Sequence, residues 1–359
     1  MKRILTDLIL CIGFVLAGCG ASQPEAPAFF TAAEWNVQAL FDGEEAGNEY
    51  GEFRESAGWT AEKYRARLTT ISKAIPLMTG KDSAPDLIGF VEIENSGVLE
   101  DLAKGELSKH GYGWIAFTRR PGSSLGIGFL SRYPLLDVRS HSITVEKASA
   151  PRPVLEARVE PGGKPLVFLL CHWKSKLGGE DATEAQRRSS ARVVQRRLRE
   201  LKESEPETPV IIMGDLNENH DEFYRRTVFS ALLPDDPDAA ALAAQGTTEP
   251  AGTRGFLVLS REKPPVASFF PEDVPALYSP WEAELSDGTF FYKGEWETID
   301  HLLLSEELFS GSGWNFAGCK VVSHAPFTTS KGVPGAYNPK NGNGLSDHLP
   351  LLLYLEYHN

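Results

Sequence analysis

Six short segments of the sequence place polar side chains where an apolar, strand-like run ends. They are Trp35-Asn36-Val37, Glu92 in GFVEIEN, His172 in LLCHWKSK, Gly214-Asp215-Leu216-Asn217, Ile299-Asp300-His301 and Ser346-Asp347-His348. Loops at the ends of a rigid scaffold are a typical place for catalytic groups. Carboxylate and amide oxygens suit a hard divalent cation, and imidazole suits proton transfer. Singly, each segment also fits a solvated strand end or a turn, because Asp, Asn and Gly favour turns.

In their order along the chain, the six segments resemble the endonuclease/exonuclease/phosphatase superfamily of metal-dependent phosphoesterases, which includes secreted deoxyribonucleases. The resemblance runs from about residue 30 to the last predicted strand. The segments WNVQALFD, PDLIGFVEIEN, HWKSKLGGEDATEAQRR, IIMGDLNE and YKGEWETIDHLLLS also resemble an exported bacterial lipoprotein branch of that superfamily. The resemblance implies hydrolysis of a phosphoester, with DNA or RNA as the expected substrate.

The resemblance implies a metal site and a nucleophile site. Glu92, assisted by Asn36, matches the family's ligands for a divalent ion, and oxygen-only ligation suits Mg²⁺ or Mn²⁺. Asp347 would bind a second metal or hold its loop. Asp215 would orient or deprotonate the attacking water, and Asn217 would donate a hydrogen bond to the phosphoryl oxygens.

Two histidines complete the implied site. His348 would contact the phosphate while Asp300 holds its imidazole in one tautomer or in the charged form. His172 matches the histidine that secreted deoxyribonucleases use as a general acid. The division of acid and base roles between His172, Asp215 and His348 stays open at this point.

Two features qualify the resemblance. Many family members carry an acidic residue two positions after the first asparagine, but this chain has Gln38, so we expect a weaker or more hydrated metal site, with Asp42 as a nearby substitute. Lys174, Lys176 and Arg187 follow His172 closely, and we expect them to hold substrate phosphates. The basic residues from Arg192 onward fit a solvated helix face instead.

The overall charge excludes one class of function. The 359 residues include 36 Lys and Arg against 49 Asp and Glu, a formal net charge of −13. Proteins that bind nucleic acid mainly through their overall field are basic, because that affinity comes from neutralising phosphates. Any phosphate chemistry must therefore depend on a local site, where a metal cation supplies positive charge.

The N-terminus has the pattern of an export signal. Lys2 and Arg3 precede an apolar run that ends in Leu16-Ala17-Gly18-Cys19, which resembles the lipobox of bacterial lipoproteins. We therefore expect a signal peptide over 1–18, a lipidated Cys19 with a tether over 19–29, and one domain over 30–359. The product would be exported and anchored by lipid to a bacterial membrane, at the cell surface or in the periplasm. We expect a monomer without an obligate protein partner, whose membrane contact is the N-terminal lipid alone.

The apolar pattern predicts an α+β fold: two mixed β-sheets packed together with helices outside, a four-layer sandwich. Predicted helices cover 60–75, 97–109 and 184–203. The pattern predicts long loops over 234–295 and no domain boundary after residue 29. Cys171 and Cys319 are expected to be free thiols. Predicted strands cover 30–41, 86–93, 113–117, 126–131, 153–159, 165–171, 209–214, 298–304 and 349–356.

A competing hypothesis is a phosphatase or phospholipase C-type enzyme, because the same catalytic set serves both classes. The acidic net charge favours small or membrane substrates. Against a sphingomyelinase-like enzyme, the sequence shows no evident exposed aromatic hairpin. A non-catalytic binding lipoprotein is disfavoured, since a degraded site should have lost some of the six segments.

Overall fold

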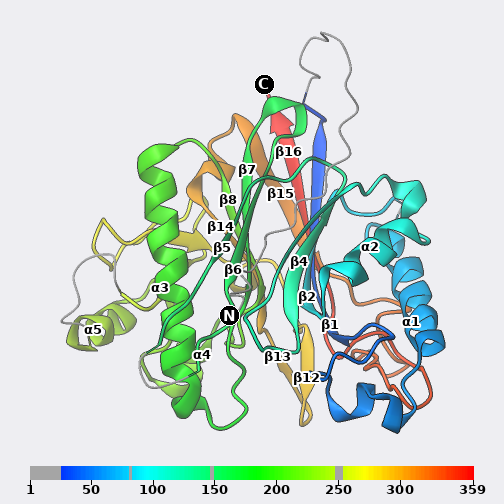
Figure 1. The fold of residues 1–359 in the computed structure, drawn as a ribbon. Coiled ribbons are helices and arrows are strands. Elements are labelled where there is room, and N and C mark those ends of the chain that lie inside the picture. Colours follow the sequence, from blue (N-terminus) through cyan, green and yellow to red (C-terminus); the bar gives the residue numbers. More distant parts are fainter. Residues whose placement is uncertain (1–25, 81–82, 146–148, 247–253) are drawn as a thin grey trace, which may run out of the picture.

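The computed structural model describes residues 26–80, 83–145, 149–246 and 254–359. Two mixed sheets pack face to face, with helices on both outer surfaces (Figure 1). This confirms the predicted four-layer α/β sandwich. The predicted signal peptide, Cys19 and most of the tether lie outside the described residues. None of the described helices has both the length and the apolar character that crossing a bilayer requires.

The six-stranded sheet joins the first four strands of the chain to the last two, in the order β15-β16-β1-β2-β4-β3. Helices α1 (Ala61–Ala74) and α2 (Ser96–Lys104) cover its outer face (Figure 1). Thr60 and Asn95 cap these helices, since their side chains accept hydrogen bonds from the backbone N–H groups of Lys63 and Val98. The strands are β1 (Phe29–Leu40), β2 (Leu87–Ile93), β3 (Trp114–Thr118), β4 (Gly126–Ser131), β15 (Gly313–Val321) and β16 (Leu351–His358).

The eight-stranded sheet has the order β5-β6-β7-β8-β14-β11-β10-β9. The 25-residue helix α3 (Glu180–Ser204) covers its outer face together with the shorter α4 (Glu222–Arg226) and α5 (Pro237–Gly246) (Figure 1). The strands are β5 (Leu136–His141), β6 (Val154–Val159), β7 (Leu166–His172), β8 (Val210–Asp215), β9 (Leu232–Pro234), β10 (Leu257–Ser260), β11 (Ala276–Tyr278) and β14 (Asp300–Leu304).

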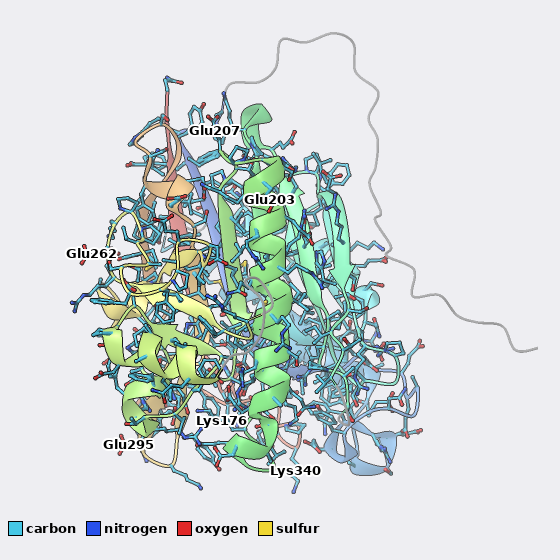
Figure 2. All side chains as sticks on the ribbon, turned by 90° about the vertical axis from the view of Figure 1, so that its left-hand side faces the viewer. Lys176, Glu203, Glu207, Glu262, Glu295 and Lys340 are labelled. Carbon is cyan, nitrogen blue, oxygen red and sulfur yellow. The ribbon has the colours of Figure 1, made fainter. Side chains whose placement is uncertain are left out.

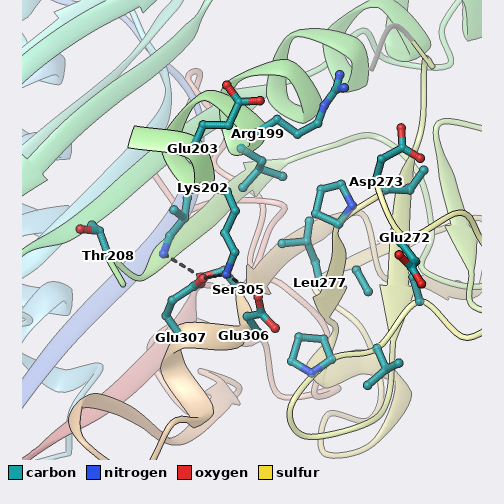
Figure 3. Close-up of a pocket in the computed structure, with 18 of the residues that line it drawn as sticks. Arg199, Lys202, Glu203, Thr208, Glu272, Asp273, Leu277, Ser305, Glu306 and Glu307 are labelled. Carbon is teal, nitrogen blue, oxygen red and sulfur yellow. Dashed lines mark hydrogen bonds and ion pairs between the residues drawn. The ribbon is translucent and has the colours of Figure 1, made fainter. Parts of the chain in front are cut away.

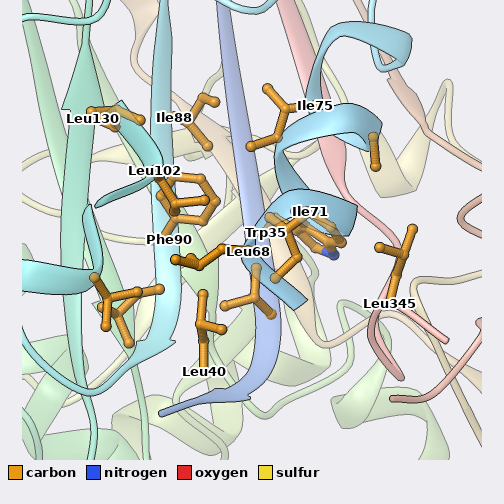
Figure 4. Packing of buried hydrophobic residues seen from close by; sticks show 14 of the residues in the cluster. Trp35, Leu40, Leu68, Ile71, Ile75, Ile88, Phe90, Leu102, Leu130 and Leu345 are labelled. Carbon is orange, nitrogen blue, oxygen red and sulfur yellow. The ribbon is translucent and has the colours of Figure 1, made fainter. Parts of the chain in front are cut away.

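Strand alternation sends β1 side chains to two different cores. Phe30 and Ala32 join the apolar layer between the sheets, while Ala33, Trp35 and Val37 pack on the helix side. Figure 4 shows Trp35 against Leu68, Ile71 and Ile75 of the α1 region. By the same alternation, Glu34 and Asn36 point between the sheets, where the polar site begins.

The structure corrects several sequence predictions. The region 234–295 holds β9, α5, β10, β11 and the hairpin of β12 (Phe290–Tyr292) and β13 (Glu295–Glu297), so it is not simply a set of loops. These strands have three or four residues, too few for a clear alternation. The expectation of no aromatic hairpin is wrong, since Tyr292 in β12 is 53% exposed. Cys171 and Cys319 are free, as predicted.

The two ends of α3 differ in their surroundings. A cleft of about 560 Å³ lies near its C-terminal end, with Leu198 and Leu277 among its apolar lining and Glu203, Glu272 and Asp273 among its acidic residues (Figure 3). Lys176, Glu295 and Lys340 mark the opposite end of the molecule (Figure 2). The residues predicted to carry chemistry gather at this second end.

Candidate active site

The sheet topology brings the six polar segments together. The parallel strands β7 and β8 end side by side, and antiparallel β14 begins at the same edge. As a result His172, Asp215 and Asp300 are direct neighbours across three strands. In the other sheet, β1 and β2 run parallel and deliver Asn36 and Glu92 to the same end.

Asp215 lies at the centre and joins the two sheets. Asn36 Nδ2 donates to Asp215 Oδ2 at 3.1 Å, and the Asn217 backbone N–H donates to Asp215 Oδ1 at 2.9 Å. The preceding Gly214 has φ +131°, and a Cβ there would lie 2.0 Å from the carbonyl oxygen of Cys171. The glycine of the GDLN segment is therefore required by this close approach of the two strands.

Glu92 and Asn36 offer oxygen donors that fit a divalent metal. Glu92 adopts φ +68°, and the backbone N–H of Ala39 donates to its Oε2 at 2.7 Å. Its Oε1 lies 3.9 Å from His172 Nε2. Burial raises the pKa of Glu92, although the charge of Arg152 opposes this. A bound cation would stabilise the charged carboxylate, so the donor chemistry of these residues fits Mg²⁺ or Mn²⁺.

His348 and Asp300 form a buried imidazole–carboxylate pair. His348 Nδ1 lies 2.7 Å from Asp300 Oδ2, which also accepts from Thr289 Oγ1 at 2.5 Å. Burial lowers the pKa of His348, but the neighbouring Asp300 more than offsets this, so the pKa lies well above its ordinary value. Ser346 Oγ donates to the carbonyl oxygen of Asn36 at 2.7 Å and fixes the histidine loop to β1. The predicted pairing of these two residues is therefore present.

His172 faces Asp215 from the other side. Its Nε2 lies 3.7 Å from Asp215 Oδ2, and its Nδ1 has no hydrogen-bond partner among the described residues. Burial, followed by the positive charges of Arg152 and His348, holds the pKa of His172 well below its ordinary value. The two histidines thus differ in charge at neutral pH, with His172 neutral and His348 an imidazolium.

Burial and neighbouring acids raise the pKa values of two carboxyl groups of this site, Asp215 and Glu34. Burial and then Asp300 raise the pKa of Asp215 to about 7. Glu34 lies two residues before Asn36 and is fully buried, with no hydrogen-bond partner for either carboxylate oxygen among the described residues. Burial and then the charges of Asp300 and Asp215 raise its pKa well above the ordinary value. The sequence gives no signal for Glu34, because an isolated Glu within a strand is usually a surface residue.

Gln38 is a loop contact in this structure. The backbone N–H of Tyr337 donates to its Oε1 at 2.6 Å, and its Nε2 donates to the Tyr337 carbonyl at 3.3 Å. Arg67 is fully buried in α1; it donates to the carbonyls of Val37, Gln38 and Ala39 and lies 3.8 Å above the Tyr337 ring. Gln38 and Ala39 both have positive φ, so this guanidinium stabilises a strained strand end. Together these contacts link β1 to the loop that carries Asp347 and His348.

Asp347 and Asp42 occupy different environments. Asp347 is half-buried, and its charge contributes to raising the pKa values of Glu92 and His348. Asp42 instead accepts from Asn95 Nδ2 at 2.7 Å and from the Glu44 backbone N–H at 2.7 Å. Asp347 is therefore placed at the site, whereas Asp42 stabilises a turn and does not replace an acid at position 38.

The three basic residues after His172 differ in accessibility. Lys174 is half-buried and donates to the carbonyls of Ser175 and Leu177, which leaves its ammonium near the site. Lys176 pairs with Glu222 at 2.6 Å. Arg187 is fully buried and donates to Glu218 and Glu184 at 2.7 Å each. This placement gives Arg187 no free face toward a substrate phosphate, and its guanidinium holds α3 against the loop after β8.

Arg152 is a cation that the sequence reasoning missed. It lies just before β6, and its Nη1 donates to the Trp173 carbonyl at 3.4 Å. Its charge affects the pKa of Glu92, His172 and Lys174, which places it beside the metal-binding and histidine sides of the site. A single arginine in a loop has no sequence pattern that separates it from a surface residue.

Comparisons with known proteins agree with this geometry. Residues 31–243 match the model of the Endonuclease/Exonuclease/phosphatase family. No curated protein matches the chain significantly.

Solved structures share the fold at low identity. TDP2 of D. rerio, complexed with single strand DNA product, has 14% identity and a TM-score of 0.52, covering 92% of this chain and 100% of that chain. A family protein from Bacteroides thetaiotaomicron has 15% identity and a TM-score of 0.51, covering 93% and 99%. The endonuclease/exonuclease/phosphatase from Beutenbergia cavernae has 14% identity and a TM-score of 0.52, covering 93% and 72%. With more than half of its length matched and the polar segments gathered at one end of the sandwich, the chain belongs to the Endonuclease/Exonuclease/phosphatase family of metal-dependent phosphoesterases.

Proposed function

We propose that this protein is an exported, Mg²⁺-dependent nuclease that hydrolyses phosphodiester bonds of DNA or RNA. The observation that carries the proposal is the row of His172, Asp215 and Asp300 across three neighbouring strands, with His348 paired to Asp300. This arrangement places the Asp215 carboxylate between a neutral histidine, His172, and a positively charged one, His348. Phosphodiester hydrolysis needs an oriented nucleophile on one side and stabilisation of the phosphoryl oxygens on the other.

The residues divide this work by position and charge. Asp215 holds the attacking water and accepts its proton, since Asn36 and the Asn217 N–H fix its carboxylate. The His348 imidazolium, held by Asp300, neutralises charge on the phosphoryl oxygens, and the Asn217 amide donates a further hydrogen bond. Burial and nearby positive charges keep His172 neutral, so it orients the leaving side by hydrogen bonding, and the leaving oxygen takes its proton from solvent water.

Glu92 and Asn36 would hold the Mg²⁺ or Mn²⁺ ion, with Asp347 close enough to hold a second ion or to order the loop. When bound, the metal supplies positive charge to the phosphate and to the leaving oxygen. Asp215, Asp300 and His348 also bring one possible ligand atom each within 4.8 Å of one another, but the His348 imidazolium is paired with Asp300, so this group serves the phosphate and not a metal ion.

The alternative function is a phosphatase or phospholipase C-type enzyme that acts on small-molecule or lipid phosphates. One observation favours it. Of the three basic residues near His172, Lys176 and Arg187 are paired with acids, so the surface beside His172 offers little unpaired positive charge to bind a long polyanion. The net charge of −13 points the same way. The nuclease keeps precedence because the deoxyribonuclease-like His172 faces Asp215 directly, and because the shared fold accommodates single strand DNA product in D. rerio TDP2.

We also propose that the protein works outside the cytoplasm as a monomer, anchored by lipid on Cys19 at the cell surface or in the periplasm. The Leu16-Ala17-Gly18-Cys19 segment motivates this location. Labelling of cells with a radioactive fatty acid should mark the wild-type protein and leave Cys19→Ser unlabelled. An unlabelled wild-type protein would remove the anchor from this proposal.

The test of function uses the purified chain without its N-terminal 25 residues, loaded with Mg²⁺ or Mn²⁺. It is incubated with plasmid DNA, RNA, inositol phosphates and phospholipids. We expect cleavage of DNA or RNA that a chelator abolishes and that Asp215→Asn lacks. Intact nucleic acid together with hydrolysis of a sugar or lipid phosphate would favour the alternative.

A further inference from the structure

The β12–β13 hairpin places a row of aromatic rings beside the catalytic histidine. Phe290 forms an isolated β-bridge with His348, and its ring lies 4.7 Å from the imidazole at an interplanar angle of 29°. The Tyr292 ring lies 6.0 Å from the Phe290 ring at 17°. Residues two apart on a strand share a face, so the row His348, Phe290, Tyr292 runs along one face of the hairpin.

The row starts inside the protein and ends in solvent. His348 is 7% exposed, Phe290 is half-buried and Tyr292 is 53% exposed. The other aromatic pair of the hairpin, Phe291 and Trp296, packs ring to edge at 5.2 Å, and Trp296 also contacts the helix-side core. Phe291 and Trp296 therefore pack the hairpin against the protein. The exposed ring of Tyr292 does not contribute to this packing.

The charges on this face of the hairpin nearly cancel. Glu295 stands opposite Tyr292 in the strand register, and Glu297 stands opposite Phe290. The Lys293 ammonium lies 5.1 Å above the Tyr292 ring and is the nearby cation at the tip. Glu297 is paired with Arg225 at 3.4 Å and accepts a hydrogen bond from Asn219, and Lys293 offsets Glu295 at the tip. The face therefore has no excess of positive charge to hold a phosphate, and it suits a flat, uncharged group that is attached to the phosphate.

We propose that Phe290 and Tyr292 form a stacking platform for a nucleobase joined to the scissile phosphate, so the enzyme selects nucleotidyl esters with an unpaired base. This inference deepens the proposed nuclease function and rests on it. Ring-to-ring steps of 4.7 and 6.0 Å connect His348 to Tyr292, so a base attached to a phosphate at His348 lies within reach. A base within a duplex has both faces covered by its neighbours, so stacking on Tyr292 requires a single strand or a frayed end.

The kinetic test compares the dinucleotide TpT with the same molecule in which an abasic tetrahydrofuran residue replaces one nucleoside. If the base stacks on the aromatic rings, the wild-type enzyme should have a kcat/KM for TpT that is about fivefold or more higher than its kcat/KM for the abasic substrate. Tyr292→Ala should lose this preference mainly through KM and keep its rate on the abasic substrate, and Tyr292→Trp should retain the preference. Phe269→Ala is the matched control, because Phe269 is 52% exposed on the loop after β10.

A binding measurement separates the platform from the nuclease function. Calorimetric titration with thymidine 5′-monophosphate and with 2-deoxyribose 5-phosphate, in Mg²⁺, should show tighter binding of the nucleotide to the wild type and equal binding of both to Tyr292→Ala. Unchanged nucleotide binding in Tyr292→Ala, or an equal loss for both ligands, would overturn the platform. If the wild type cleaves neither dinucleotide, the nuclease proposal fails, while the titration still decides whether the hairpin binds a base.

Discussion

Two groups of buried charged residues, one under α3 and one between the sheets, are paired in opposite ways. The α3 cluster consists of Glu156, Arg197 and His141: Arg197 donates to both Glu156 oxygens at 2.7 and 2.8 Å, and His141 Nε2 lies 2.6 Å from one of them. Burial opposes ionisation of Glu156, but the hydrogen bonds from His141 and Arg197 outweigh it and lower its pKa to about 2. Every acid in this cluster has a basic partner.

The catalytic cluster, defined as Glu34, Asp215, Asp300, His172 and His348, has more buried acids than cationic partners. Its three carboxylates share one imidazolium, and the pKa of Asp215 rises to about 7. Glu34 has no hydrogen-bond partner among the described residues. The paired charges of the α3 cluster thus stabilise the folded protein. The carboxyl groups of the catalytic cluster lower its stability, as is common in active sites whose function requires shifted pKa values.

The largest effect should come from neutralising the centre of the catalytic cluster. Asp215→Asn removes the acceptor for the water's proton, so kcat should fall by about 10³-fold. The same change removes repulsion between buried acids, so the free energy of unfolding should not decrease. Rates on a phosphodiester and urea unfolding curves measure the two quantities.

Asp221→Asn is the control, since Asp221 pairs with Arg225 near the surface and should leave kcat unchanged. A fall in stability of Asp215→Asn that parallels its loss of activity would show that Asp215 also supports the fold. Asp215 would then stabilise the fold as Glu156 does, and the proposed difference between the two clusters would be wrong.

The α3 cluster should respond in the opposite way. Glu156→Met takes the acid from the half-buried His141 and leaves Arg197 only the exposed Glu200, so it should lower the free energy of unfolding by about 3 kcal/mol, with kcat per folded molecule unchanged. The folded pKa of Glu156 lies at about 2, below its ordinary 4.5, so its contribution is complete above pH 4.5 and is lost as pH falls toward 2. The difference between wild type and variant should therefore shrink over that range.

Unfolding curves at a series of pH values between 7 and 3 measure this difference. The exposed Glu160, near the end of the same strand, gives a matched control, because Glu160→Met should change stability by no more than about 0.5 kcal/mol. A difference that stays constant as the pH falls would mean that charge pairing is not what Glu156 contributes.

The sequence predicts the strands that carry the two clusters where those strands have a clear apolar pattern. The apolar runs of β7 and β8 give these strands to within a residue, and their polar ends identify His172 and Asp215. Alternation also places His301 away from the site, and it is buried with Nε2 donating to the Glu218 carbonyl at 2.8 Å. Strand β15 has a register shift between Phe316 and Gly318 and a half-exposed surface, so its pattern is too weak to define it.

The tertiary partners of charged residues are not encoded in local patterns. Lys174 and Arg187 are both expected from the sequence to hold substrate phosphates, yet Arg187 is buried against Glu218 and only Lys174 lies near the site. Glu34 and Glu156 are both single acids in strands, and only the packing of sheet on sheet or helix on sheet decides which one finds a base. The sequence therefore indicates which strand ends carry the polar residues that the fold brings together, and it does not indicate how charges inside the layers are paired.

Asp300→Asn tests the single pairing within the catalytic cluster. Without the Asp300 charge, the pKa of His348 should drop, and kcat should fall by about 10²-fold at neutral pH. Since a histidine with a raised pKa loses its charge as pH rises through that pKa, the variant should lose activity at lower pH than the wild type. Thr289→Val is the matched control, because it removes one hydrogen bond to the same carboxylate and leaves its charge.

NMR titration of the His348 ring measures the pKa directly. In Thr289→Val the ring should titrate near the wild-type value, with less than a tenfold loss in kcat. Equal pH profiles for wild type and Asp300→Asn would show that the charge of His348 does not depend on this pair.

The smallest effect, and the only gain in stability, is expected at Glu34. Glu34→Met replaces an unpartnered carboxyl by an apolar side chain of similar length, and the free energy of unfolding should rise by about 1 kcal/mol. Activity should fall at the same time, since Glu34 lies close enough to Asp300 and Asp215 for their charges to raise its pKa, and the methionine changes the polarity beside both. Thermal unfolding and kcat on one preparation measure both.

Glu34→Gln separates polarity from charge at the same position. An amide keeps the shape but still lacks partners, so the stability of this variant should stay close to that of the wild type, in which burial already favours the neutral acid. The same Glu→Met change should thus stabilise the protein at Glu34 and destabilise it at Glu156. A loss of stability at both positions would mean that Glu34 has a structural partner in solution, and that the catalytic cluster is held in the same way as the α3 cluster.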